Sequence, residues 1–398
     1  MAAAGKAGAA AASEGYRPPN PATESQRGTG ADRIRRPRRS GCSTLWEECG
    51  AVSGTRIRPE RLKELTLLLL IVVTVIAFWL LVDNYLSARF VNRVTQGVAI
   101  TAVLAAGQSL VILTRNIDLS IGSIAGVSAY VTGDILGNHG GTNSVVAVLI
   151  AVGIGALLGL INGVIVAYGR IPSIIVTLGT LAIYRTWLIS FGDARTITAD
   201  SLPSWVVDLP RSTVVSFGDY ELRTMFLLAV VVVVALQFVL GWLRAGRMLY
   251  AVGSNAEAAR QAGLPERRIT VVAFVACGAL AGLGGFLFLA RFGTITVTAG
   301  RGLELEAIAA AVVGGVSTLG GSGTVVGALF GAALIGLLDQ SLGRVPEVSE
   351  FMRDAVLGIL ILLAVVVDGV ITNRLTARRP IIAADSGPPT LLATGASP

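Results

Sequence analysis

Residues 111–123 read V-I-L-T-R-N-I-D-L-S-I-G-S, which places an arginine and an aspartate three residues apart between two long apolar runs. Ionisable groups near a bilayer are costly and tend to mark transport paths. The plainer interpretation is a short polar turn at the membrane surface that joins two spanning helices. Both interpretations place Arg115 and Asp118 in a membrane protein.

The overall composition excludes an ordinary soluble protein. The 398 residues are 53% hydrophobic and 14% charged, with a mean hydropathy of +0.71, whereas soluble domains are roughly 25% charged. The 48 glycines agree, because small residues let membrane helices pack closely.

Uninterrupted apolar segments of about 20 residues predict membrane-spanning helices. We expect an all-α integral membrane protein with ten spans, in a polytopic region over residues 65–371. The third, eighth and ninth segments contain glycine and polar residues, so they are the candidates for broken or re-entrant helices. The ten segments are 65–82, 94–114, 119–137, 145–168, 171–191, 225–243, 269–290, 304–318, 323–341 and 354–371.

The order of the segments suggests two related halves of five spans. The only internal similarity that supports a repeat sets residues 155–159 and 170–172 against residues 331–336 and 344–346. This similarity is weak, because membrane helices share their composition.

The distribution of charge predicts the orientation. Residues 1–64 hold twelve Lys or Arg against seven acids, and residues 244–268 hold five against two, whereas residues 192–224 hold five acids and three arginines. Basic residues favour the cytoplasmic side, so we expect both termini in the cytoplasm. The net charge of +7 is then a topology signal, and no nucleic-acid partner is expected. Residues 1–64 and 372–398 are predicted to be disordered tails.

The sequence lacks the patterns of catalytic and metal sites. His139 is the only histidine, and the three cysteines, two of them in the predicted cytoplasmic tail, predict no disulfide framework. No phosphate-binding G-x-x-x-x-G-K-[ST] loop is present. We therefore expect no catalytic residues, no metal and no bound cofactor, and any ATP that drives the protein must be bound and hydrolysed by another chain.

Residues 254–263 predict a short helix on the largest inner loop. Ser254-Asn255-Ala256-Glu257 fits a capping box, in which the Ser side chain and the Glu side chain satisfy each other's backbone N–H groups. Gly263, followed by Pro265, supplies the stop. Arg260 lies on the same helix, whose position suits contact with another protein.

Five motifs, in order, resemble the membrane subunits of bacterial ABC importers for ribose, xylose, rhamnose and autoinducer-2. The resemblance covers about residues 62–371. Within the group, the Arg-Asn-Ile-Asp version is most similar to autoinducer-2 permeases. The motifs are residues 113–123, residues 176–180 with 184–185, residues 253–260, residues 302–309, and residues 314–315 with 320–324.

The resemblance implies a multi-pass permease in the cytoplasmic (inner) membrane of a bacterium. It implies three partners besides the lipid bilayer: a cytoplasmic ATP-binding subunit, an external substrate-binding protein, and a second permease subunit, identical or different. The predicted short helix would be the ATPase-coupling helix, through Ser254, Asn255, Glu257, Arg260 and Gly263. The outer arginines Arg195, Arg211, Arg301 and Arg344 are candidates for docking the binding protein, since complementary charges guide such encounters.

The remaining polar residues divide between a pathway and structure. A neutral polyhydroxylated substrate needs hydrogen-bonding groups along its path, and Gln108, Asn162, Thr177 and Thr180 are the candidates. Taken singly, each is better explained by a bond to a neighbouring helix. By topology the polar stretch with Arg115, Asp118, Ser120 and Gly122 falls at the cytoplasmic ends of the second and third spans, so we interpret it as a structural turn or inner gate.

Other charged residues near the spans have structural explanations. Arg185 is expected to reach toward the outer surface. Glu304 and Glu306 are expected to favour a helix N-terminus. Two alternatives to the sugar permease stay open: a secondary carrier or channel gated by Arg115 and Asp118, and an ABC permease for branched-chain amino acids or nucleosides.

Overall fold

The computed structural model describes residues 59–366, with gaps at 194, 346–347, 350–351, 353–354, 357, 360–361 and 364–365. The chain divides into two units at Arg56, and the first unit lies outside the described residues. Apart from residues 59–64, so do both predicted tails and most of the expected tenth span. All that follows concerns the second unit.

Seven described helices are long and apolar enough to cross a membrane, which confirms the all-α membrane class. The expected count of ten spans is not reached within the described residues. The seven helices are α2 (Pro59–Leu81), α3 (Ala88–Leu113), α5 (Ser144–Gly169), α6 (Ser173–Gly192), α8 (Thr224–Trp242), α11 (Glu266–Phe292) and α13 (Val325–Leu342).

Two further helices stand where weak spans were expected. Helix α4 (Ile121–Asn138) replaces the third, and α12 (Leu303–Val313) replaces the eighth. At 11 residues, or about 16 Å, α12 crosses only half of a bilayer. The predicted weakness of the ninth span is wrong, because α13 runs unbroken over 18 residues.

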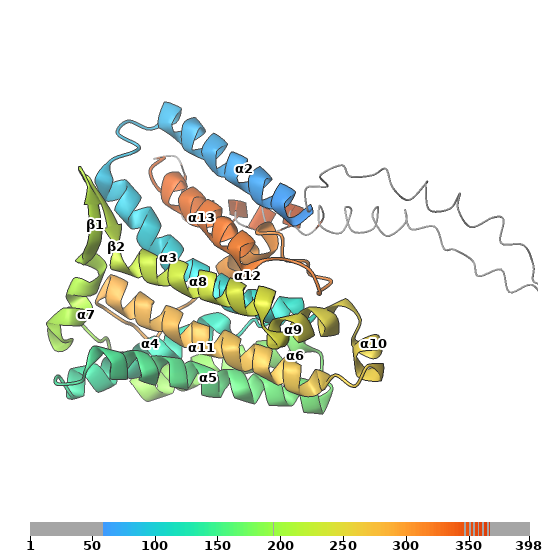
Figure 1. The fold of residues 1–398 in the computed structure, drawn as a ribbon. Coiled ribbons are helices and arrows are strands. Elements are labelled where there is room, and N and C mark those ends of the chain that lie inside the picture. The colour runs from blue at the N-terminus through green and yellow to red at the C-terminus, as the bar shows by residue number, and fades with distance from the viewer. Residues whose placement is uncertain are drawn as a thin grey trace, which may run out of the picture. The chain divides into compact units, whose positions relative to one another are not determined.

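Short elements lie at the two ends of the long helices (Figure 1). One end, here the hairpin end, carries η1 (Ala199–Ser201), α7 (Ser204–Asp208), η2 (Leu209–Arg211) and the strands β1 (Thr213–Phe217) and β2 (Tyr220–Arg223). The strands are antiparallel and meet at the pair Phe217↔Tyr220. The other end, here the α10 end, carries α9 (Arg244–Ser254) and α10 (Ala256–Gln261).

Helices α3 and α11 form the centre of the packing. Every residue from Val98 to Thr114 is buried. Helix α11 lies directly against α5, where Gly155 and Gly278 face each other so closely that a Cβ on either would overlap the other's carbonyl oxygen. Glycine is needed at this seam because it lets two helix backbones approach closely.

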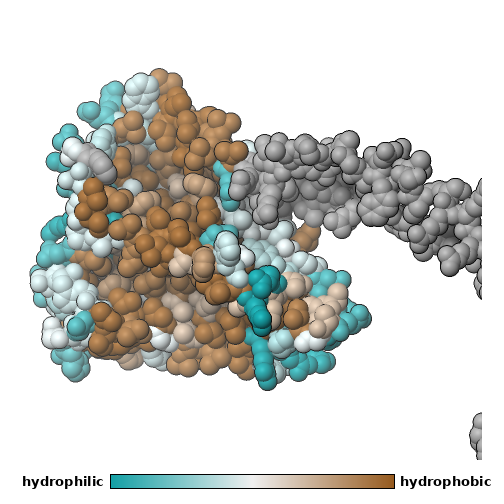
Figure 2. Space-filling view, in the orientation of Figure 1, coloured by the Kyte–Doolittle hydropathy of each residue, from teal (hydrophilic) through white to brown (hydrophobic). Residues whose placement is uncertain are grey.

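The outside of the helices is apolar. Large hydrophobic side chains are exposed along α2, α5, α6 and α8, including Leu69 (63%), Leu149 (63%) and Val231 (58%). Figure 2 shows this apolar surface between polar atoms that gather toward the hairpin end and the α10 end. A soluble protein would not leave such a surface open to water, so these helices belong in a bilayer.

Candidate functional site

The loop that joins α3 to α4, residues 114–120 and here the motif loop, is organised around a buried carboxylate. Asp118 is 0% exposed, and its Oδ1 accepts hydrogen bonds from the backbone N–H of Ser120 (2.8 Å) and from its hydroxyl (2.6 Å). The other oxygen, Oδ2, has no partner among the described residues. Burial raises the pKa of Asp118, and the hydrogen bonds from Ser120 act in the opposite direction. The aspartate holds the loop closed at the start of α4.

Two of the pathway candidates bind the motif loop to neighbouring helices. With its amide oriented to satisfy both contacts, Gln108 donates to the carbonyl of Asp118 and accepts from its N–H, each at 3.1 Å. Asn162 of α5 donates to the Ser120 hydroxyl at 2.7 Å and accepts from Tyr184 of α6 at 3.3 Å. One buried network therefore ties α3, α5 and α6 to the loop.

The other two candidates, Thr177 and Thr180, serve the backbone of α6. Thr177 donates to the carbonyl of Ser173 at 2.9 Å and lies 3.3 Å from that of Ile117. Thr180 lies 3.4 Å from the carbonyl of Thr177. All four candidates are buried, at 0–6% exposure. In this conformation they hold helices together, and their contact with a substrate stays a prediction.

Arg115 points away from this network and contacts α9. Its Nε donates to the carbonyl of Gly253 (2.5 Å) and its Nη2 to that of Ser254 (2.6 Å), so it binds the carbonyls of the last two residues of α9. The N–H of Gly321 donates to the carbonyl of Leu113 at 3.0 Å. A Cβ at Gly253 would overlap that same carbonyl oxygen. Three sequence motifs thus meet at the α10 end. Because they lie far apart along the chain, the sequence did not predict this contact.

Helix α10 confirms the predicted short helix but corrects its cap. Ser254 is the last residue of α9, and its hydroxyl donates to Tyr250 (2.8 Å). The N-cap is Asn255, whose Oδ1 accepts from the N–H of Ala258 at 3.0 Å. The predicted Ser254–Glu257 capping box is therefore wrong, because α9 already holds Ser254 in a helical backbone. Glu257 instead pairs with Arg260 at 2.8 Å.

The C-terminal side of α10 ends as predicted. Gly263 has φ +78°, a left-handed conformation that suits glycine, and its N–H donates to the carbonyl of Arg260 at 3.0 Å. Beyond it lies a hollow of about 610 Å³ lined by Ala167, Tyr168, Arg170, Arg260, Leu264, Pro265, Glu266, Arg267 and Arg268. The surface beside α10 is strongly basic.

A second meeting of motifs lies deeper, around Gly122. A Cβ at Gly122 would overlap the Oε2 of Glu304 and approach the carbonyl of Gly300. Arg185 donates to the carbonyl of Ala299 at 3.1 Å, and its Nη2 lies 4.0 Å from the same Glu304 oxygen. Arg185 also lies 3.3 Å from the carbonyl of Thr298, and its expected reach toward the outer surface stays a prediction.

The two glutamates of α12 occupy its first turn, as expected. There the helix dipole favours negative charge. Glu306 also accepts a hydrogen bond from Thr101 of α3 at 3.2 Å.

Three of the four docking candidates are exposed, but only Arg195 and Arg211 belong to the loop at the hairpin end, because Arg301 follows Gly300, which lies beside Gly122 at the start of α4. Arg195 and Arg301 are exposed, and the Arg211 side chain is 79% exposed with Asp208 4.0 Å away. Arg344 instead donates to the carbonyls of residues 83–85 at 3.1–3.3 Å and lies over the Phe90 ring. Its observed role is to hold the turn between α2 and α3.

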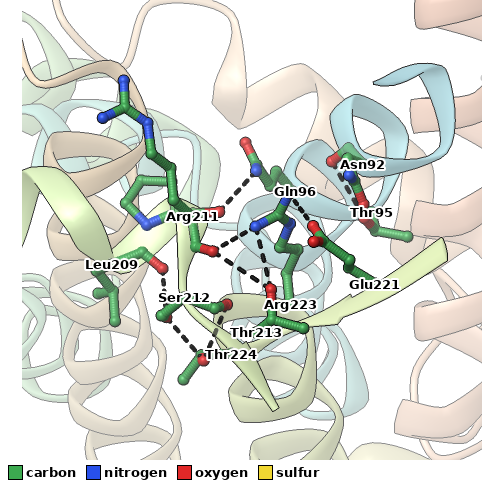
Figure 3. A network of polar contacts seen from close by, with 11 residues as sticks. Asn92, Thr95, Gln96, Leu209, Arg211, Ser212, Thr213, Glu221, Arg223 and Thr224 are labelled. Atoms are coloured by element: carbon green, nitrogen blue, oxygen red, sulfur yellow. Dashed lines mark hydrogen bonds and ion pairs between the residues drawn. The ribbon is translucent and has the colours of Figure 1, made fainter. Parts of the chain in front are cut away.

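Sequence reasoning missed the polar network that builds the hairpin end (Figure 3). Arg223 contacts Glu221, the carbonyl of Arg211 and the Thr213 hydroxyl. Gln96 of α3 donates to the carbonyl of Pro210 at 2.9 Å. The Gly-Asp pair at residues 218–219 was an available signal, because two-residue turns of this kind favour hairpins.

A comparison with known protein families shows which family carries these motifs. The family model described as branched-chain amino acid transport system / permease component matches residues 91–365. The match includes the motif loop, α10 and α12. The chain belongs to this permease family.

Named relatives narrow the type of permease. The permease is 36% identical over 302 residues, 76% of its length and 83% of the relative's, to the autoinducer 2 import system permease protein LsrC of Yersinia pseudotuberculosis serotype O:3 (strain YPIII). The protein of the same name from Escherichia coli O9:H4 (strain HS) is 36% identical over 307 residues, 77% and 87% of the two chains. No solved structure matches.

These matches confirm the resemblance to ABC sugar-importer permeases. The permease is a multi-pass protein of the inner membrane and a transporter subunit, not a catalytic enzyme. The alternative of a secondary carrier is not favoured, because the family that matches more than half of the chain consists of permease components of transport systems.

Proposed function

We propose that this permease imports a neutral sugar or a sugar-like signal of the autoinducer-2 type, driven by a separate ATP-hydrolysing subunit that binds at α10. Two findings support the substrate class: the names of the relatives, and the Arg-Asn-Ile-Asp sequence of the motif loop. The buried network contributes amides and hydroxyls, which suit a polyhydroxylated substrate.

The observation that carries the proposal is the contact of Arg115 with Gly253 and Ser254. Helix α10 follows α9 directly, so a push on α10 moves the carbonyls that Arg115 holds. Arg115 belongs to the motif loop, and Gln108 and Asn162 attach that loop to α3 and α5. ATPase closure would therefore reach the spanning helices through a short chain of hydrogen bonds.

The orientation follows from the same assignment. The α10 end, with Arg260, Arg267 and Arg268 around a basic hollow, faces the cytoplasm and the ATPase. The hairpin end faces outward, where the exposed Asp208 and Arg211 meet a substrate-binding protein. A second permease subunit completes the transporter. ATP is bound by the partner, so this chain needs no cofactor of its own.

Breaking α10 tests the proposal. Ala258→Pro removes the N–H that donates to the Asn255 cap and disfavours a helical conformation at Glu257, so it should abolish co-purification of the ATPase and ATP-driven uptake. Gly140→Pro is the matched control, because Gly140 lies in an exposed loop at the hairpin end with open space around it. Equal recovery of the ATPase with both variants, or full uptake in ATP-depleted vesicles, would contradict the proposal.

A further inference from the structure

The chain between α11 and α12 is not helical and runs deep into the helical domain: residues 294–296 form a β-bridge segment, and residues 297–302 form turns. Ile295 pairs with Ile197 through two hydrogen bonds of 2.9 Å. Ile197 lies beside Gly133 of α4, whereas Gly300 lies beside Gly122. These two glycines of α4 are separated by about 16 Å along the helix axis, and Ala299 lies between them, beside Gly126. The segment thus follows α4 through about half of a 30 Å hydrocarbon layer.

The two faces of this segment differ. Ile295 (0%) and Ala299 (6%) are buried against the domain. Thr294, Thr296 and Thr298 alternate with them and are exposed. These three residues, here the threonine face, line a hollow of about 310 Å³ together with Phe288, Phe292, Ala299, Gly300 and Arg301.

The threonine face does not suit lipid. Non-helical backbone and unshielded hydroxyls cost several kcal/mol in hydrocarbon and are found at membrane depth only where they are buried in protein or line water. Thr296 and Thr298 share a hydrogen bond of 2.9 Å with each other, which leaves both hydroxyl oxygens able to accept further bonds. The face therefore calls for water or a polar ligand.

The lining defines the kind of ligand. Hydroxyls from three threonines and the phenyl rings of Phe288 and Phe292 suit a small molecule with both hydroxyl groups and C–H surfaces. Among the residues that the structure describes, no carboxylate lines the hollow and Arg301 adds a positive charge, so a cation is disfavoured there. A second permease chain would more naturally meet a tightly packed surface of small residues than an open polar hollow.

We infer that the threonine face lines the water-filled entry of the transport path and binds the neutral, polyhydroxylated substrate after its release at the hairpin end. The inference rests on the proposed import function and adds its substrate-contacting segment. Arg185 positions the end of that segment next to α12. It donates to the carbonyl of Ala299 at 3.1 Å and lies 4.0 Å from the carboxylate of Glu304.

Thiol labelling tests whether the face is wet. Thr294, Thr296 and Thr298 are replaced singly by cysteine, with Cys42 and Cys49 changed to serine, and intact cells receive a membrane-impermeant maleimide. The buried Cys277 stays in place. Thiols react as thiolates and need water, so all three variants should label. Val231→Cys, on the apolar surface of α8, and Ile295→Cys, on the buried face, should not. Failure of the threonine positions to label overturns the inference.

Hydroxyl removal tests contact with the substrate. Thr296→Val and Thr298→Val keep the side-chain shape, and each should lower uptake of whichever of ribose, xylose, rhamnose or autoinducer-2 the wild type imports by roughly 3–30-fold. Thr74→Val is the control, because its hydroxyl bonds to Leu70 in its own helix. Unchanged uptake in both valine variants overturns the inference. If the wild type imports none of the four compounds, the maleimide result decides.

The inference and the proposed function fail separately. Labelling of the threonine face requires neither ATP nor an ATPase, whereas the Ala258→Pro experiment leaves this face untouched. Labelled threonine positions together with an unbound ATPase would retain the wet path and reject the ABC assignment. A bound ATPase together with unlabelled threonine positions would retain the ABC assignment and reject the water-filled path.

Discussion

Replacing Arg115 by alanine should release α10 from the motif loop without unfolding the helices. The variant loses two charge-assisted hydrogen bonds, to the carbonyls of Gly253 (2.5 Å) and Ser254 (2.6 Å). Such bonds are worth about 1.5–3 kcal/mol each when shielded from water. Arg115 is exposed, and water takes over part of this role, so we expect a loss of roughly 1–2 kcal/mol for the pair.

That loss corresponds to about a 5–30-fold increase in the population with α10 detached. Amide hydrogen exchange of residues 253–263 in detergent should accelerate by the same factor. In reconstituted vesicles with the ATPase, substrate imported per ATP should fall while hydrolysis continues. Arg115→Lys should be intermediate, because an ammonium group lacks the planar fork that spans two carbonyls.

The matched control is Arg247→Ala, on the same helix α9. Arg247 donates to the carbonyl of Trp242 at 3.0 Å, and within the described part of the chain it forms no hydrogen bond with the motif loop. Its removal should leave exchange at 253–263 and uptake per ATP unchanged. The reasoning is refuted if Arg115→Ala exchanges at the wild-type rate, or if both variants accelerate exchange equally.

Three further predictions concern the same two centres. Gly122→Ala should lower the free energy of unfolding by about 1–3 kcal/mol, because the new Cβ would overlap Glu304. Gly140→Ala is the control and should leave the free energy of unfolding unchanged, because Gly140 has open space around it. Thermal unfolding in detergent distinguishes the two variants. Asp118→Asn should become more stable than the wild type as the pH rises above the ordinary aspartate range. The reason is that a raised pKa of Asp118 means that its charged form destabilises the fold. Equal pH profiles of unfolding for the two proteins would contradict this. Asn255→Ala should lower the stability of α10 by about 1 kcal/mol and weaken ATPase binding, and unchanged binding would argue against the cap.

The sequence predicted the features that depend on neighbouring residues. Apolar length located the seven spans, and glycine within the eighth segment foresaw the short α12. The shift of the α10 cap from Ser254 to Asn255 shows the limit of this kind of reasoning. Both residues are good caps by chemistry, and the choice depended on how far α9 extends.

Contacts between distant segments could not be predicted in this way. Gln108, Asn162 and Tyr184 come from three helices and meet only because the motif loop folds back beside α3. The contact of Arg185 with Glu304 was missed for the same reason, because the two residues lie far apart along the chain. Polar residues in the spans were recognised singly, but their grouping required the packing.

The glycine seam between α5 and α11 also sets an order for biosynthesis. Its two sides, which include Gly155 and Gly278, are separated along the chain by α6, the hairpin and α8 to α10. Until the ribosome has made α11, the glycine groove of α5 has only lipid or a chaperone to cover it. The centre of the domain therefore closes late, and a chain interrupted before Glu266 would present that groove to the quality-control proteases of the membrane.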